Sequence, residues 1–342
     1  MSRSNIAQLI LAAPAVLTAE KSFRRNPVIG SERLNQRGLH RRRVALAARM
    51  AERRRAALAP RLDPDERARF DRDGFVIREN ALPPELLARV REELATRPLP
   101  AWEMRQGQTI NRVLPLPRDR SALGELARFV HRPDVHTLIG YAAGRTGNVV
   151  TMLQTIAVDP ASGESDPQAH LHADTFHPTA KFWLFLHDVG DDDGPFAYVP
   201  GSHRLTPERL AWEDAEARTA TQSADPHHAA GSFRLTEDGL GRLGYGGLQR
   251  FPVPGNTLVV ADTYGFHRRV ESLRPTVRTS LYGVARRNPF APWNGLDVRD
   301  LPFVRDRGMS IYLAGEDRRA KRGKKVVYAN VGTILAGAEQ QL

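Results

Sequence analysis

Two histidines and one aspartate in the second half of the chain have the types and spacing of metal ligands. His172 and Asp174 form an H-x-D pair, and on extended chain two side chains at i and i+2 point to the same side. His267, which follows an apolar stretch at residues 257–261, is the candidate third ligand. Two imidazoles and one carboxylate on one face of an octahedron form the facial triad of non-haem Fe(II) sites. The three residues therefore predict an Fe(II) site.

A basic residue downstream of His267 fits an anionic cosubstrate of such a site. Arg278 lies eleven residues after His267, and Ser280 follows two residues later. A guanidinium binds a carboxylate through two parallel hydrogen bonds, and a nearby hydroxyl adds a third. Because an H-x-D pair alone recurs by chance, this spacing is needed to strengthen the prediction. Arg278 and Ser280 are thus candidates for binding the distal carboxylate of 2-oxoglutarate.

The composition limits the other kinds of site. The chain has 342 residues, 41% of them hydrophobic, and no cysteine. Disulfides, zinc-cysteine sites, iron-sulfur clusters and cysteine nucleophiles are excluded, so any metal must have nitrogen and oxygen ligands. No apolar run reaches the roughly 18 to 20 residues that span a bilayer. We expect a cytoplasmic enzyme.

The elements that must position these residues are mainly strands. From residue 149 onward, short apolar stretches alternate with Gly, Pro and Asp turns, as in an antiparallel sandwich or barrel. The expected strands are residues 149–158, 181–189, 196–199, 257–261 and 277–285. Residues 205–250 interrupt this pattern with a helical piece and a Gly-rich loop, and we expect this insertion to cover the mouth of the barrel.

Before residue 149 the pattern is mixed. Asp63 and Pro64 have the types of an N-cap and a first helical residue, and Gly74 ends that helix. A strand over residues 75–77 follows. Further helices are expected over residues 84–96 and 121–139, and an extended segment over residues 108–116.

The region from Asp63 to Arg286 resembles the phytanoyl-CoA dioxygenase family. The resemblance rests on the opening helix with its D-G-F-V strand, the H-x-D pair, the segment G-P-x4-P-G-S-H at residues 194–203, and the spacing from His267 to Arg278. Asp193 and Asn256 depart from the family pattern, but both are turn-compatible residues. The resemblance implies a double-stranded β-helix, a jelly-roll or cupin-like barrel, with Fe(II), 2-oxoglutarate and O2 at its open end.

The resemblance also implies a basic or amide residue on the strand before the H-x-D pair. Gln154 and Thr155 are the candidates for this contact with 2-oxoglutarate. His170 is expected to support His172 from the same face, and His203 to form a local hydrogen bond. Alternation over residues 181–188 does not say which face of the strand is buried, and Trp183 is interpreted as a core residue.

The first 60 residues differ from the rest in charge. They hold 13 Lys and Arg and 3 Asp and Glu, which is +10 of the net +11, so residues 61–342 are almost neutral. This distribution argues against nucleic acid as a partner of the main domain. We expect a basic, partly helical extension at 1–60, with a helix at 39–58, and the oxygenase domain at 61–342.

Two arrangements of the extension remain open. The apolar stretch at residues 6–19 and the arginines that follow it are compatible with peripheral contact with an anionic membrane. A signal peptide is less favoured because only Arg3 precedes the stretch. Alternatively, the basic segment folds over Glu213, Asp214 and Glu216 of the insertion.

The most favoured function is an Fe(II)- and 2-oxoglutarate-dependent dioxygenase that hydroxylates an unactivated C–H bond of a small-molecule or lipid-linked substrate and releases succinate and CO2. Halogenases of this class lack the carboxylate ligand, so Asp174 favours hydroxylation. A cupin-like metal-binding sensor or isomerase needs the triad but not Arg278. A membrane-surface adaptor with an inert barrel is the third alternative.

Overall fold

Two antiparallel sheets form the centre of the molecule. The computed structural model describes residues 10–164, 166–292, 300–301 and 304–336. The larger sheet has eight strands in the order β1 (Phe75–Arg78), β8 (Thr257–Asp262), β5 (Ala180–Phe185), β10 (Thr276–Ala285), β4 (Val150–Val158), β3 (Thr109–Leu114), β2 (Pro98–Gln106) and β11 (Ala329–Leu335). The smaller sheet has the order β7 (Gln249–Phe251), β6 (Phe196–Tyr198) and β9 (His267–Arg269).

The larger sheet is buried on both faces, because alternate side chains of each strand enter different cores. On β5, Phe182 and Leu184 pack in the core that also contains residues of the flanking helices. These helices are α5 (Pro84–Thr96), α6 (Ala122–Arg128) and α7 (Pro133–Ala142). Phe185 on the opposite face packs with Phe196 and Phe251 of the smaller sheet.

The arrangement is the jelly-roll, cupin-like architecture expected from the sequence, mainly β with flanking helices. The two sheets face each other and are not joined into one continuous hydrogen-bonded barrel in the part of the chain that the structure describes. The site-bearing residues enter the space between the sheets from β4, β5, β9 and β10.

Local signals placed several elements correctly. Helix α4 (Pro64–Asp73) begins at Asp63, whose Oδ1 accepts hydrogen bonds from the backbone N–H groups of Asp65 and Glu66 at 3.0 Å. It ends at Gly74, which has φ +88°, and a Cβ there would lie 2.5 Å from Nδ1 of His203. The strand at 75–77 and the helix at 84–96 are confirmed as β1 and α5.

Other boundaries were wrong. The helix expected over residues 121–139 is two helices, because Pro133 has no backbone N–H and starts a new helix at its first position. The strand expected at 181–189 ends at Phe185. Four strands, β2, β7, β9 and β11, were not predicted; β7 and β9 have only three residues each, too few to show a period.

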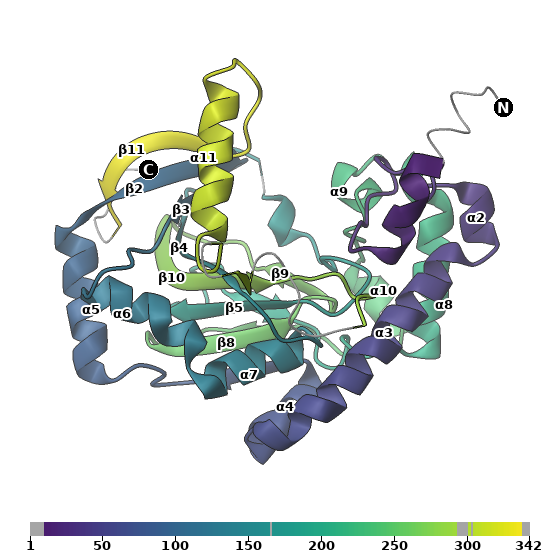
Figure 1. The fold of residues 1–342 in the computed structure, drawn as a ribbon, viewed down its shortest axis with the longest axis horizontal. Helices are drawn as coiled ribbons and strands as arrows, with labels where there is room; N and C mark the ends of the chain where they lie inside the picture. Colours follow the sequence, from purple (N-terminus) through teal and green to yellow (C-terminus); the bar gives the residue numbers. More distant parts are fainter. Residues whose placement is uncertain (1–9, 165, 293–299, 302–303, 337–342) are drawn as a thin grey trace.

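The N-terminal segment lies along one side of the molecule. It contains α2 (Glu32–Gln36) and α3 (Leu39–Leu58), and α3 runs beside α8 (Pro207–Thr219) of the insertion (Figure 1). The helix expected at 39–58 is confirmed, and its buried face includes Val44, Ala47 and Ala51. Nε2 of His40 lies 2.9 Å from Oε2 of Glu213, so the segment contacts one of the three acidic residues of the insertion.

The insertion packs behind the H-x-D segment. Besides α8 it contains α9 (Pro226–Ala229) and α10 (Glu237–Arg242), so the expected Gly-rich loop is partly helical. Leu240 packs with Leu171, Ala173 and Phe266, which adjoin the candidate ligands. The remaining helix is α11 (Gly308–Ala320), and the short 3-10 helices are Ala13–Leu17, Ala59–Arg61, Phe129–His131, Pro167–Ala169 and Ala220–Gln222. None of the helices in the described ranges has the length and apolar character needed to span a membrane.

Candidate metal centre

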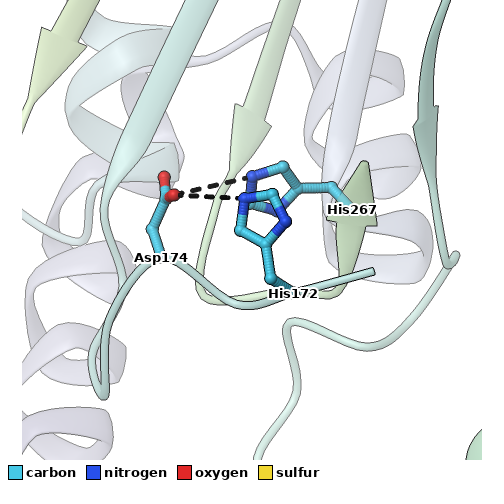
Figure 2. A group of neighbouring side chains, drawn as sticks. All are labelled: His172, Asp174 and His267. Carbon is cyan, nitrogen blue, oxygen red and sulfur yellow. Dashed lines mark ion pairs between the residues drawn. The ribbon is translucent and has the colours of Figure 1, made fainter. Parts of the chain in front are cut away.

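The structure brings the three predicted ligands together. His172 lies outside the regular strands and pairs with His267, the first residue of β9, through two backbone hydrogen bonds of 3.0 and 2.9 Å. In Figure 2 both imidazoles point toward the Asp174 carboxylate, and each Nε2 lies 3.7 Å from its Oδ1. One donor atom from each residue lies within 4.8 Å of the others. This is the spacing of groups that can share one cation.

Backbone carbonyls fix the imidazole tautomers. Nδ1 of His172 donates to the carbonyl of His170 at 2.7 Å, and Nδ1 of His267 donates to that of Gly265 at 2.9 Å. Each Nε2 therefore carries a lone pair. Burial lowers the pKa of His267 to about 4 and holds that of His172 well below its ordinary value, with the neighbouring His267 lowering it further. Both rings are neutral at pH 7, which is the form that binds metals.

Lys181 on β5 orients the carboxylate ligand. Its Nζ lies 2.6 Å from Oδ2 of Asp174, which leaves Oδ1 directed at the two imidazoles. Burial alone would raise the pKa of Asp174, but Lys181 and the two histidines hold it well below its usual range. The residue is thus an anion, and its two oxygens have different partners.

The donor set fits a divalent cation on structural grounds. Among the described residues, Nε2 of His172 and Nε2 of His267 are buried without a hydrogen-bond partner. A buried polar atom without a partner is costly, so such a pair beside a carboxylate indicates a missing ligand. Two neutral imidazoles and one carboxylate with open positions match the preference of Fe(II).

A cavity of about 220 Å³ opens beside the triad, between the two sheets. Its lining includes aromatic, amide and cationic side chains. These are Met104, Gln106, Asn111, Gln154, Ile156, Gln168, Lys181, Trp183, Phe185, Phe196, Arg268, Arg269, Arg278, Ser280 and Tyr282, together with His172 and His267. The expectation that Trp183 is a core residue is therefore corrected, since the β5 face with Lys181, Trp183 and Phe185 is the one that meets the cavity.

Arg278 and Ser280 lie on the same face of β10 and both line this cavity. Nη1 of Arg278 donates to the carbonyl of Gly194, whereas its Nε and Nη2 are buried and have no partner in the described part of the chain. Burial, with Arg269 nearby, lowers the pKa of Arg278 to about 9, and the group remains a cation at pH 7. Two unpaired guanidinium donors form a fork of the kind that binds a carboxylate.

Of the two candidates on β4, the structure brings only Gln154 to the cavity. Gln154 is opposite Ser280 in the register, and its Nε2 donates to Oδ1 of Asn111 at 3.1 Å. The hydroxyl of Thr155 lies 3.1 Å from that of Thr279, away from the cavity lining. Successive residues of a strand point to opposite faces, so the two could not both reach one ligand.

Two other expectations for histidines were wrong. The side chain of His170 is exposed, and this residue supports His172 through its backbone carbonyl instead. His203 is buried with its ring 5.3 Å from that of Phe70, but its Nδ1 has no hydrogen-bond partner among the described residues. The sequence also gave no indication that Lys181 contacts Asp174, because a strand pattern does not identify the partner of a cation.

Three solved structures with similar arrangements illustrate the comparisons with known proteins. The epimerase SnoN in complex with Fe3+, alpha ketoglutarate and nogalamycin RO shares 19% identity, with 67% of this chain and 83% of that chain covered and a TM-score of 0.43. HygX from Streptomyces hygroscopicus, with nickel and 2-oxoglutarate bound, shares 16%, with 66% and 87% covered and a TM-score of 0.43. EctD from S. alaskensis with bound Fe shares 14%, with 72% and 85% covered and a TM-score of 0.43. No curated protein sequence matches the chain.

The jelly roll and its His-Asp-His triad define a non-haem iron enzyme that uses 2-oxoglutarate. The family model of phytanoyl-CoA dioxygenase matches residues 70–234, and this part of the chain belongs to that family. The match includes His172 and Asp174, while His267 and Arg278 lie beyond it. Fe(II), 2-oxoglutarate and O2 are the metal and cosubstrates of such a site.

Proposed function

We propose that the protein hydroxylates an unactivated C–H bond of a small-molecule substrate. In the balanced reaction, one oxygen atom of O2 enters the C–H bond, the other enters succinate, and 2-oxoglutarate loses CO2. Fe(II) with 2-oxoglutarate supplies the oxidising chemistry when bound. The observation that carries the proposal is the complete triad, since a carboxylate ligand occupies the position that halogenases leave open.

The residues of the chain have separate tasks in this proposal. His172, Asp174 and His267 hold the metal through Nε2, Oδ1 and Nε2. Nε and Nη2 of Arg278, with the hydroxyl of Ser280, bind the distal carboxylate of 2-oxoglutarate.

Cavity-wall residues complete the site. Gln154 adds an amide, and its position is fixed by Asn111. Trp183 and Tyr282, whose ring centroids lie 5.8 Å apart, form an aromatic wall that excludes water and orients the substrate.

The test follows 2-oxoglutarate and the product mass together. Anaerobic addition of Fe(II) and 2-oxoglutarate should give a weak visible charge-transfer band, and the His172→Ala variant should lack it. With O2 and a substrate found by screening, succinate should appear and the product should gain one oxygen atom. An isomerised product of unchanged mass would refute hydroxylation while leaving the iron and cosubstrate assignment intact. Full function in an Arg278→Ala variant would favour the sensor or isomerase.

A peripheral contact with an anionic membrane, and with it a lipid-linked substrate, is a second proposal. Ile10, Leu11 and Leu17 are 68%, 82% and 62% exposed, in a segment followed by exposed arginines. Exposed apolar side chains beside cations are typical of interfacial segments. Residues 6–9 of the apolar stretch lie outside the described residues.

Vesicle co-sedimentation tests this contact. Because α3 is packed into the protein, removing residues 1–60 would disturb the fold, and the double variant Leu11→Ser, Leu17→Ser is the better probe. Binding should need anionic lipid, weaken with salt and fall in the double variant. Equal sedimentation of both proteins, or none at low salt, would exclude the contact and favour a small substrate that is not lipid-linked.

A further inference from the structure

Four cationic side chains from four different segments surround the carboxylate ligand. Lys181 of β5 contacts its Oδ2 at 2.6 Å, and Nζ of Lys21 from the N-terminal segment donates to the Asp174 backbone carbonyl at 2.5 Å. Arg234 of the insertion is the backbone bridge partner of His172, and Arg286, which follows β10, interacts electrostatically with Asp174. We propose that these cations form a subsite that binds an anionic group of the substrate, a carboxylate or a phosphate, beside the metal.

Arg234 provides the strongest indication of a missing ligand. Its side chain is 12% exposed, and its Nε and Nη1 are buried without a hydrogen-bond partner in the described part of the chain. The carboxylate of Asp225 is 3.4 Å from Nε, which is an ion pair but not a directed hydrogen bond. Buried guanidinium donors normally have acceptors, so an acceptor from outside the chain fits here.

The charge balance also leaves room for an anion. The four cations face three carboxylates, Asp174, Asp225 and Glu20, which leaves one positive charge. The +2 charge of Fe(II) is matched by the −2 charge of 2-oxoglutarate, which Arg278 binds elsewhere in the cavity. Burial, together with the three other cations, lowers the pKa of Lys21 to about 8, although Asp174 opposes this shift. Crowded like charges of this kind are stabilised when an anion binds between them.

Lys21 is held in place by several backbone contacts of its segment. Arg43 of α3 donates to the carbonyls of Val16, Thr18 and Glu20 at 2.9, 3.1 and 2.7 Å. Arg286 donates to the carbonyl of Ala19 at 3.1 Å. The family match begins at residue 70, so the N-terminal segment adds to the site a cation that lies outside the matched region.

This inference rests on the proposed function, because it names the class of substrate that the same site accepts. A monoanionic carboxylate and a phosphate monoester share the required chemistry, since both offer several oxygens to guanidinium and ammonium donors. The subsite would hold the anionic group close to the metal, so the C–H bond attacked should lie a few bonds from that group.

Calorimetric titration of the loaded protein tests the subsite without turnover. The protein is loaded anaerobically with Fe(II) and saturating 2-oxoglutarate, and inorganic phosphate and acetate are titrated separately. We expect one of the two to bind at a single site without removing the visible chelate band, and its identity tells whether the subsite prefers phosphate or carboxylate. Arg234→Gln and Lys21→Gln should each weaken this binding about tenfold or more.

Matched variants control for general charge effects. Arg242→Gln in the insertion and Arg25→Gln in the N-terminal segment remove one exposed cation each and should bind the probe like the wild type. Arg234→Lys should recover part of the affinity, which separates a charge effect from misfolding. Wild-type affinity in both subsite variants, or no binding of either probe to the wild type, would overturn the subsite. Loss of the chelate band in the wild type would instead contradict the proposed function, and the anion titration can still be read on the metal-free protein.

Discussion

Buried arginines have opposite surroundings in two regions of this molecule. In the packing between α3 and the sheet, Arg55 donates to the carbonyls of Tyr141 and Ala142 at 3.0 and 2.8 Å and to Oδ2 of Asp262 at 2.7 Å. In the cavity, Arg278 has one backbone acceptor, and its Nε and Nη2 have none among the described residues. A guanidinium with its acceptors supplied by the chain stabilises the fold, whereas one with unpaired donors is available for a ligand.

Asp262 shows why the first region matters for the second. Its carboxylate also accepts from the backbone N–H groups of Thr179 and Tyr264, and its carbonyl accepts from the Tyr198 hydroxyl. It therefore fixes the turn that leads from β8 to His267. The N-terminal helix thus supports the metal ligand through a buried ion pair, although it is remote from the ligand in sequence.

The largest expected effect on stability is that of Arg55→Ala. The substitution leaves the Asp262 carboxylate, which is fully buried, without its cation, and breaking a buried pair costs about 3 to 5 kcal/mol of unfolding free energy. Denaturant unfolding measures it. Arg53→Ala, on the exposed side of the same helix, should change the free energy by less than about 0.5 kcal/mol. Equal effects of the two variants would remove the distinction between the regions.

Arg278→Ala should give the reverse pattern. Truncating a buried charged partner weakens binding of the paired ligand by about 2 to 5 kcal/mol, here the affinity for 2-oxoglutarate. The free energy of unfolding should change little, because the guanidinium is desolvated and poorly paired before the ligand binds. Titration of the chelate band gives the affinity, and Fe(II) binding measured without 2-oxoglutarate is the control. A comparable loss of both affinities would mean that Arg278 is structural.

A buried histidine between the two regions predicts a pH dependence of stability. His177 is 1% exposed, its Nδ1 donates to the carbonyl of Pro178, and burial lowers its pKa to about 3. The unfolded chain takes up this proton near pH 6.5, so stability is present above that pH and is lost as the pH falls toward 3. The loss at pH 5 is about 2 kcal/mol.

The free energy of unfolding of the metal-free protein, measured from pH 7 to pH 4, checks this dependence. A His177→Gln variant should lose about 1.4 kcal/mol less per pH unit than the wild type. His170→Gln, at an exposed position, should retain the wild-type slope. Parallel curves for the wild type and His177→Gln would show that this histidine is protonated in the folded protein.

The smallest effects separate the two faces of β4 and β10. Ser280→Ala removes a hydroxyl that lines the cavity and should weaken 2-oxoglutarate binding by about 1 kcal/mol. Thr155→Val removes the hydroxyl paired with Thr279 and should reduce the unfolding free energy by a similar amount, with 2-oxoglutarate affinity unchanged. An altered affinity in Thr155→Val would restore Thr155 as a contact.

The sequence by itself determined the features that depend on neighbouring residues. The H-x-D pair, the spacing from His267 to Arg278, the cap at Asp63 and the turn at Gly74 are local patterns whose geometry follows from a few adjacent backbone angles. The alternation on β5 was visible as well, with Lys181 and Trp183 on one face and Phe182 and Leu184 on the other.

Only the tertiary structure decided which of these faces meets the cavity, because that depends on β6 and β9 packing against the larger sheet. For the same reason it decided between Gln154 and Thr155, and it placed Lys21, Arg234 and Arg55 around a site more than a hundred residues away from some of them. Long side chains of Lys and Arg find their partners through the fold, and no local pattern records which carboxylate or carbonyl they will reach.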